Sequence, residues 1–360
     1  MTDIDDFFGS DYAAARARFL DACRRAGVDA ASHINPESGR AGQELGMDVA
    51  RIGDPKATRL LVLQSGVHGP ELMCGSGCQT GLLRERYFDD LPAGVAVLLV
   101  HAVNPWGAAQ LRRNTEDNVD LCRNFMDFDE PLPENPAYES LHGAFAAAAS
   151  AESPATLREA LQSAEREAGI GDFLSALMAG QYAHADGFSY GGAGPTWSNR
   201  VLTDVLCEHA ANASRVVALD YHSGLGPYGY GSAVVMQSGE ALDRAGQWFG
   251  DWVVAPRAES GPEEFYPVYG HCADGYVQSL PDAEVTFVTI EYGTYSAQRN
   301  FAALIDDHWR AVCQDAPEAA VRDIKQEMVQ THCPDDPEWR YAVWTRSEQV
   351  VRQAMGCLLR

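Results

Sequence analysis

Short, almost continuous apolar runs recur along the chain and alternate with stretches of helical periodicity. Each run is bounded by turn residues, which is typical of strands buried on both faces of a sheet. The predicted strands are residues 59–67, 95–103, 215–221, 232–237 and 285–292. The predicted helices are residues 11–27, 71–88, 204–213, 239–252 and 301–314, with a terminal helix within residues 334–360. This alternation predicts an α/β fold.

The composition of the chain changes in its middle part. Residues 127–136 are acidic and rich in proline, and residues 137–181 are rich in Ala, Glu and Leu. A glycine-rich loop follows at residues 187–195. We interpret residues 127–195 as a helical insertion within a single domain that spans residues 1–360.

Two side chains that can ligate a metal lie three residues apart at a predicted strand-to-helix turn. His68 and Glu71 stand in the sequence Ser-Gly-Val-His-Gly-Pro-Glu, where a strand ends and a helix begins. An imidazole and a carboxylate suit Zn²⁺, and a catalytic zinc site often combines two ligands close in sequence with a distant one. A lone His-x-x-Glu also occurs by chance. The zinc prediction therefore depends on what other strand ends supply.

Two further strand ends carry suitable residues. His222 follows the apolar run that begins at Arg215, in the sequence Asp-Tyr-His-Ser-Gly, and we take it as the third zinc ligand. Glu291 ends the last predicted strand, where an unpartnered carboxylate would be costly to bury. Because α/β sheets bind ligands beyond the carboxyl ends of their strands, these residues should meet there. Glu291 then fits the general base that takes a proton from water.

The net charge of the chain limits the kinds of molecule that it can bind. The 360 residues include 51 Asp and Glu against 27 Lys and Arg, a formal charge of −24, which argues against nucleic acid and anionic membranes as partners. Against this background Arg112, Arg113 and Arg123 form a small basic cluster after the second predicted strand. Arginines so placed suggest a bidentate grip on a substrate carboxylate or stabilisation of an oxyanion.

The sequence says less about the cellular compartment of the protein and about its oligomeric state. The nine cysteines are scattered without a Cys-x-x-Cys pair, which favours reduced thiols. The amino terminus resembles no secretory signal, and no apolar run approaches the roughly 20 residues that span a bilayer. We therefore expect a cytoplasmic protein. The sequence leaves open whether it forms a homo-oligomer.

Taken together, these motifs resemble the zinc metallocarboxypeptidase family and the related aspartoacylase-like and succinylglutamate-desuccinylase-like deacylases. The resemblance covers roughly residues 59–296. The matching elements are His-x-x-Glu at His68 and Glu71, the histidine before a serine at His222, the late glutamate Glu291, Asn-Pro-x-Gly from Asn104 to Gly107, Arg112-Arg113, and the segment from Asp120 to Asn124. Cys122 stands where the family usually has an asparagine that helps to hold the substrate's terminal carboxylate.

The resemblance implies a mixed sheet of about eight strands flanked by helices, one Zn²⁺ per chain and hydrolysis of an amide bond. By the same resemblance Arg112 polarises the carbonyl oxygen, with Arg113 as the alternative register. The resemblance also implies that Arg123, together with Arg113 and Asn124, binds the substrate. A tyrosine before the catalytic glutamate often contacts substrate in the family, and the candidates are Tyr266, Tyr269 and Tyr276.

Two readings of the function follow. The first is a zinc-dependent hydrolase of a small peptide or of an N-acyl amino acid, and the choice between a carboxypeptidase and a deacylase stays open. Cys122 favours the deacylase slightly, because a thiol lacks the paired donors of an amide. The second is a non-catalytic relative that keeps the fold and binds a metal or another ligand. Every catalytic residue type is present, which speaks against this second reading.

Overall fold

A mixed eight-stranded sheet forms the centre of the protein, as the sequence predicts. The computed structural model describes residues 4–39, 42–148, 153–256, 268–313 and 315–359. The strands lie in the order β1-β2-β4-β3-β5-β8-β6-β7. They are β1 (Ala30–Ser38), β2 (Glu44–Gly53), β3 (Arg59–Ser65), β4 (Val95–His101), β5 (Arg215–Gly224), β6 (Gly231–Val234), β7 (Val253–Val254) and β8 (Glu284–Gly293).

The five predicted strands correspond to β3, β4, β5, β6 and β8. Of these, β4, β3, β5 and β8 run parallel to one another in the middle of the sheet. Their carboxyl ends therefore meet at one edge. Three strands were not predicted: β1 and β2, which pair antiparallel at one side of the sheet, and the two-residue β7.

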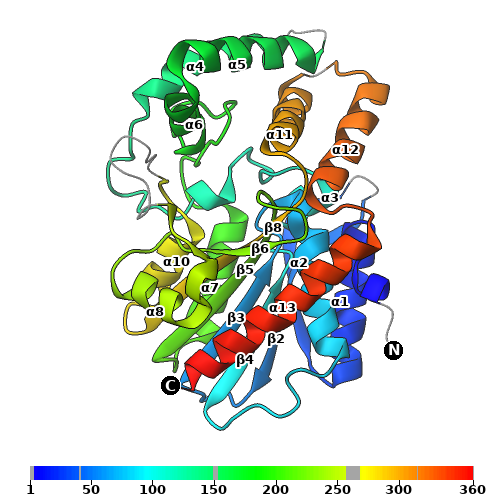
Figure 1. Cartoon of the computed structure of the whole chain (residues 1–360), viewed down its shortest axis with the longest axis vertical. Coiled ribbons are helices and arrows are strands. Elements are labelled where there is room, and N and C mark those ends of the chain that lie inside the picture. Colours follow the sequence, from blue (N-terminus) through cyan, green and yellow to red (C-terminus); the bar gives the residue numbers. More distant parts are fainter. Residues whose placement is uncertain (1–3, 40–41, 149–152, 257–267, 314, 360) are drawn as a thin grey trace.

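Helices cover both faces of the sheet (Figure 1). The α-helices are α1 (Tyr12–Ala26), α2 (Leu72–Arg84), α3 (Pro105–Gln110), α4 (Pro136–Ala148), α5 (Pro154–Ala168), α6 (Ile170–Met178), α7 (Trp197–His209), α8 (Glu240–Phe249), α10 (Cys272–Ser279), α11 (Ala297–Val312), α12 (Glu318–His332) and α13 (Pro337–Leu358). Short 3₁₀ turns are η1 (Ile4–Phe7), η2 (Gly69–Glu71), η3 (Leu121–Arg123) and η4 (Gly250–Trp252).

The helix predicted from residue 204 begins earlier in the structure. α7 starts after Thr196, whose hydroxyl accepts the backbone N–H of Asn199 and caps the helix. The helix α12 was not predicted at all. The remaining predicted helices correspond to α1, α2, α8, α11 and α13.

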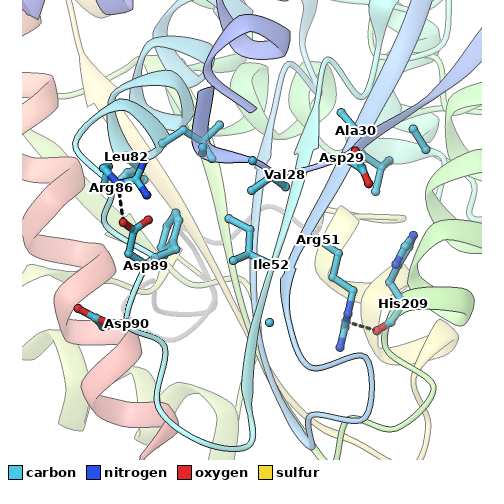
Figure 2. A pocket seen from close by; sticks show the side chains of 17 residues that line it. Val28, Asp29, Ala30, Arg51, Ile52, Leu82, Arg86, Asp89, Asp90 and His209 are labelled. Carbon is cyan, nitrogen blue, oxygen red and sulfur yellow. Dashed lines mark hydrogen bonds and ion pairs between the residues drawn. The ribbon is translucent and has the colours of Figure 1, made fainter. Parts of the chain in front are cut away.

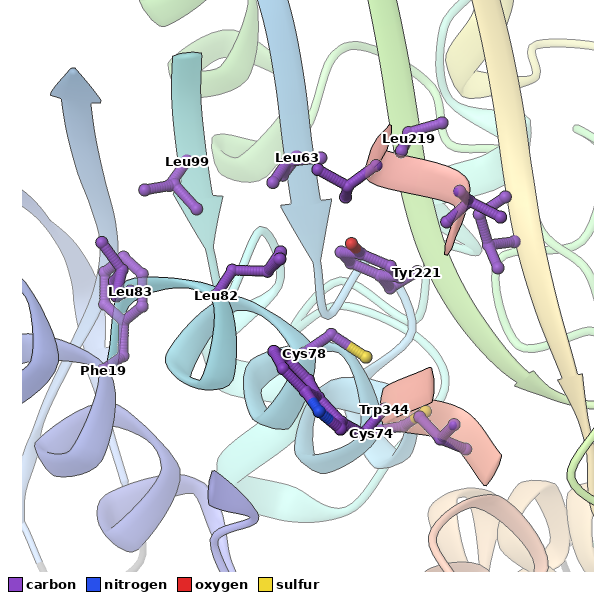
Figure 3. Packing of buried hydrophobic residues seen from close by; sticks show 14 of the residues in the cluster. Phe19, Leu63, Cys74, Cys78, Leu82, Leu83, Leu99, Leu219, Tyr221 and Trp344 are labelled. Carbon is purple, nitrogen blue, oxygen red and sulfur yellow. The ribbon is translucent and has the colours of Figure 1, made fainter. Parts of the chain in front are cut away.

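One hydrophobic cluster lies between the sheet and the helices α1, α2 and α13. Cys74 and Cys78, one turn apart on α2, are fully buried in it beside Tyr221 and Trp344 (Figure 3). Their thiols pack as apolar groups in the core. A second cluster packs α7 and α10 against the opposite face.

The predicted insertion contains α4, α5 and α6, which lie beyond the carboxyl ends of the parallel strands (Figure 1). These helices share a third hydrophobic cluster with α11 and α12, built around Tyr138, Phe145 and Trp309. The insertion therefore has its own packing partner, and it covers the edge of the sheet where His68, His222 and Glu291 lie. Within the described residues no helix is both long and apolar enough to cross a bilayer.

Candidate functional site

The three predicted zinc ligands converge at the carboxyl ends of β3 and β5. His68 follows β3, Glu71 ends the η2 turn before α2, and His222 lies in β5. The Nδ1 atom of His68 is 2.9 Å from Glu71 Oε1, and the Nδ1 atom of His222 is 2.9 Å from Glu71 Oε2. One ligand atom from each residue lies within 4.8 Å of the others, and all three side chains are buried. This donor set fits a zinc ion.

Close backbone packing fixes the turn that carries His68. Gly66 has φ of +73°, a conformation that favours glycine, and it lets the chain reverse after β3. A Cβ atom on Gly69 would lie 2.1 Å from the carbonyl carbon of Gly107. Asn104 accepts the backbone N–H of Gly107 at 2.8 Å and caps α3. The Asn-Pro-x-Gly element therefore shapes the surface on which the His68 turn rests.

Two buried aspartates orient the histidines. His222 Nε2 lies 2.7 Å from Asp220 Oδ2, and His68 Nε2 lies 3.3 Å from Asp120 Oδ1. When each Nε2–H donates to its aspartate, each Nδ1 lone pair is free to bind the metal. Sequence reasoning missed this role, although Asp220 stands two residues before His222, on the same face of β5.

The charges of the site favour a bound cation. Burial raises the pKa of Glu71, but His68 and His222 outweigh it and hold that pKa well below its usual range. Burial and Arg113 favour neutral His68, yet Glu71 and Asp120 raise its pKa to about 10 in the absence of a metal. The carboxylates thus attract positive charge, which a proton or a metal ion can supply. Metal binding at this site should release protons.

We expect Asp220→Ala and Asp120→Ala to weaken zinc binding about 10–100-fold each, because the histidine tautomer and ring orientation are no longer fixed. Competition with a chromophoric chelator measures the affinity, and circular dichroism checks that the variants fold. The matched control is Asp282→Ala, an exposed aspartate outside the site. Unchanged affinity in both aspartate variants would contradict the orienting role.

Glu291 lies next to the ligand set, since it pairs with His222 across β5 and β8. Its Oε1 accepts the backbone N–H of Leu225 at 2.9 Å. Burial, and then the negative charge of Glu71, raise the pKa of Glu291 to about 7. Among the described residues no arginine forms an ion pair with Glu291. Within the described residues, Glu291 therefore does not serve to neutralise a buried arginine.

The structure corrects the placement of the two adjacent arginines. Arg113 lies in the site, with Nη1 3.2 Å from His68 Nδ1 and Nε 3.0 Å from Asp120 Oδ2. Arg112 points away, because its guanidinium donates to Asn118 at 2.8 Å and lies 3.6 Å from Asp307 on α11. The structure does not bring Arg112 to the ligand set.

The neighbouring residues Arg123 and Asn124 also point to different places. Arg123 lines the cavity beside the ligands, and its guanidinium donates to the backbone carbonyls of Met178 and Cys122. Asn124 does not line that cavity. Its side chain is fully buried, donates to the carbonyls of Gly191 and Gly194, and accepts from Thr196. Asn124 therefore closes the loop that ends the insertion, and the structure does not bring it to the cavity where the sequence predicts it.

The cavity beside the ligand set has a volume of about 350 Å³. His68, His222, Glu291, Arg113 and Arg123 contribute its polar wall. Its apolar wall consists of Leu225, Val234, Met236, Val254, Pro256 and Val268. The thiol of Cys122 also faces this cavity and lies 3.7 Å from that of Cys272.

Neither of the two predicted tyrosines that the structure describes, Tyr269 and Tyr276, lines the cavity. Tyr276 is fully buried and donates its hydroxyl to Gln64 at 2.6 Å. Tyr269 is half-buried and does not line the cavity. Tyr266 lies outside the described residues.

A larger hollow of about 850 Å³ lies where α1 ends, beside β2 and the loop after α2 (Figure 2). Its two arginines are already engaged. Arg51 donates to the carbonyl of His209 at 2.7 Å, and Arg86 pairs with Asp89. None of the candidate metal-ligating groups found in the described residues lines this hollow. The smaller cavity at His68 is therefore the candidate active site.

A protein family described as a protein of unknown function (DUF2817) matches residues 8–346. The chain belongs to this family. The match includes every residue of the candidate zinc site, so the site belongs to the family's own region and not to an appended segment. None of the curated proteins matches the chain.

Several solved structures are similar to this DUF2817 chain at low identity. The succinylglutamate desuccinylase from Chromobacterium violaceum is 14% identical, with 82% of this chain and 73% of that one covered and a TM-score of 0.38. An aspartoacylase family protein from Mesorhizobium loti is 13% identical, with coverage of 79% and 67% and a TM-score of 0.38. Thrombin activatable fibrinolysis inhibitor is 12% identical, with coverage of 88% and 78% and a TM-score of 0.43. These likenesses assign no activity to the chain.

Proposed function

We propose that the chain is a zinc-dependent hydrolase that cleaves an amide bond in a small peptide or an N-acyl amino acid. One observation carries the proposal. His68, Glu71 and His222 point their ligand atoms at one place, and Glu291 and Arg113 line the same cavity. Such a combination of a metal-ligating triad, a carboxylate of raised pKa and a guanidinium is typical of metal-assisted amide hydrolysis.

Zinc fits the donor set, since two imidazoles and one carboxylate form the ligands of many catalytic zinc sites. The Nδ1 atoms of His68 and His222 and the carboxylate of Glu71 would hold it. Bound zinc supplies Lewis acidity, which polarises a carbonyl group and makes water more acidic. Asp120 and Asp220 keep the imidazoles in the tautomer that this task needs.

Glu291 and Arg113 supply the remaining chemistry. The Leu225 N–H holds Glu291 Oε1, so the other carboxylate oxygen is available to take a proton from the attacking water and to pass it to the leaving amine. Arg113 is anchored through its Nε to Asp120, and its Nη1 lies against His68, which leaves the N–H groups of Nη2 to stabilise the developing oxyanion. Proton transfer and charge stabilisation thus fall to different residues.

The cavity limits the size and character of the substrate. Ligand pockets commonly measure about 300–1,000 Å³, so this one accommodates a single side chain or a short acyl group. Its apolar wall favours an apolar group. Arg123 is the residue at hand for a substrate carboxylate, although three of its N–H groups already donate to backbone carbonyls. Both a carboxypeptidase and a deacylase of N-acyl amino acids suit this arrangement.

The test combines metal analysis with a substrate screen. The purified protein should contain zinc, and a His68→Ala/His222→Ala variant should lose the zinc that supports activity. N-acyl amino acids and short peptides are then screened, with loss of activity on chelation and its return on adding zinc as controls. Activity that survives both chelation and the double substitution would overturn the proposal.

The alternative of a non-catalytic relative makes a different prediction. Such a protein would bind zinc and a ligand through the same residues, but it would hydrolyse no compound in the screen. Ligand binding would then be unaffected by Glu291→Gln, because a base has no task in a binding module. The raised pKa of Glu291 and its place in the cavity favour the enzyme.

A further inference from the structure

A second group of metal-ligating side chains lies on the insertion, outside the site described above. His142 lies on α4, and His184 and Asp186 lie in the segment that follows α6. One ligand atom from each of these three residues lies within 4.8 Å of the others. Glu139, one turn before His142 on α4, has both carboxylate oxygens within 3.0 Å of His184 Nε2.

One ring nitrogen of His142 is buried without a hydrogen-bond partner in the described residues. The His142 side chain is only 19% exposed, and the nitrogen in question is Nδ1. Its Nε2 lies 3.9 Å from Asp186 Oδ1, beyond hydrogen-bond distance. A buried polar atom without a partner costs about 1–3 kcal/mol. A cation bound through the Nδ1 atom of His142 would remove that cost.

The rings of His142 and His184 are stacked, with centroids 3.5 Å apart. If both imidazoles were protonated, two positive charges would face each other at this distance, which is unfavourable. A single divalent cation would bind at the ring edges instead, through the in-plane nitrogen lone pairs of neutral imidazoles and the flanking carboxylates. The charge balance therefore favours one shared ion over two protons.

The backbone around His184 is held in place before any ion binds. The buried Gln181 side chain donates to the carbonyl of His184 at 2.7 Å and accepts the backbone N–H groups of Ala183 and His184. Tyr138, on α4, accepts the backbone N–H of Phe188 at 2.6 Å. Because both ends of the segment are fixed to their surroundings, His184 presents its ring to α4 at little entropic cost.

We propose that His142, His184 and Asp186, with Glu139 beside them, bind a second divalent cation of the zinc class. Imidazole and carboxylate donors suit zinc and its neighbours better than calcium or magnesium. The bound ion would tie α4 to the segment 181–188. The same segment accepts two hydrogen bonds from the side chain of Asn118, the partner of Arg112, so the ion would stiffen the cover of the active site.

The test uses the full chain with the first site removed. After chelation and dialysis, His68→Ala/His222→Ala protein is titrated with Zn²⁺, and with Co²⁺ for its absorption spectrum. We expect one equivalent to bind and to raise the melting temperature. A His142→Asn/His184→Asn variant of the intact protein should bind one equivalent where the wild type binds two, and Asp186→Asn should weaken only the insertion ion.

Controls separate this site from surface binding and from the proposed function. A His33→Asn/His209→Asn variant removes two histidines from elsewhere and should leave both equivalents in place. If His68→Ala/His222→Ala protein binds no cation while circular dichroism shows it folded, the second site is overturned. If the wild type binds one equivalent that only His142→Asn/His184→Asn abolishes, the second site stands and the zinc hydrolase fails.

Discussion

Replacing Glu291 by glutamine is expected to lower kcat by about 10²–10⁴-fold while zinc stays bound at His68, Glu71 and His222. The amide has nearly the size of the carboxylate and can still accept the Leu225 N–H, so the cavity keeps its shape. It cannot take a proton from water. Steady-state kinetics on the best substrate of the screen, together with metal analysis of the same sample, measures the two effects separately.

The pH dependence of the wild type follows from the same residue. A general base must be ionised, so kcat/KM falls as the pH drops through the pKa of Glu291. Burial and Glu71 raise that pKa to about 7 in the absence of a metal, and a neighbouring Zn²⁺ lowers it. The loss of activity on the acid side should therefore lie below pH 7.

The matched control is Glu284→Gln, at the other end of the same strand. Glu284 pairs with Arg215 at 2.6 Å and does not line the cavity. Its substitution should leave kcat and zinc content unchanged. An active Glu291→Gln enzyme with an unaltered pH profile would show that another group acts as the base.

Four of the five strands that the sequence predicts are almost completely buried. β3, β4, β5 and β8 are buried along almost their whole length, and a continuous apolar run marks such a strand. β1 is largely exposed and lies at the side of the sheet, so it lacks a distinct apolar pattern. β7 has two residues, too few for any periodicity.

The convergence of the three candidate ligands could be predicted because local sequence and strand position agree. His68, Glu71 and His222 all lie at strand ends that a parallel sheet brings together. Asp120 is different, since it reaches His68 from a loop 52 residues away. Nothing in its neighbourhood marks it as an orienting residue. Pairing between distant segments sets that contact, and local pattern does not encode it.

The proposed second cation site on the insertion could not be predicted from the sequence either, because it also depends on contacts between distant segments. His142 and His184 are 42 positions apart, and each is an isolated histidine in the sequence. Only the packing of α4 against the segment after α6 stacks their rings. A spacing rule finds ligands on one helix or at one turn, and this group has neither arrangement.

The register of Arg112 and Arg113 illustrates the limit most clearly, because the two residues are chemically identical neighbours. Their tertiary partners decide which of the two lies at the candidate ligand set. Asp120 draws Arg113 inward, and Asn118 and Asp307 draw Arg112 outward. The segment alone contains no information on which aspartate will be near.

Arg113→Met is expected to lower kcat by about 10²–10³-fold, because the transition state loses a donor to its oxyanion. Arg112→Met should leave kcat within a few-fold of wild type and instead lower the free energy of unfolding by about 1–3 kcal/mol, since Asn118 and Asp307 lose a partner. Kinetics and urea unfolding on both variants distinguish the roles.

Arg113→Lys adds a further control. Lysine keeps the positive charge but cannot donate to Asp120 and to a substrate oxygen from one planar fork. If charge alone matters, this variant is nearly as active as wild type. If the fork matters, it remains slow although zinc is bound. The reverse outcome would be a slow Arg112→Met enzyme and an active Arg113→Met enzyme. It would mean that the loop changes conformation when substrate binds and that Arg112 is the catalytic arginine.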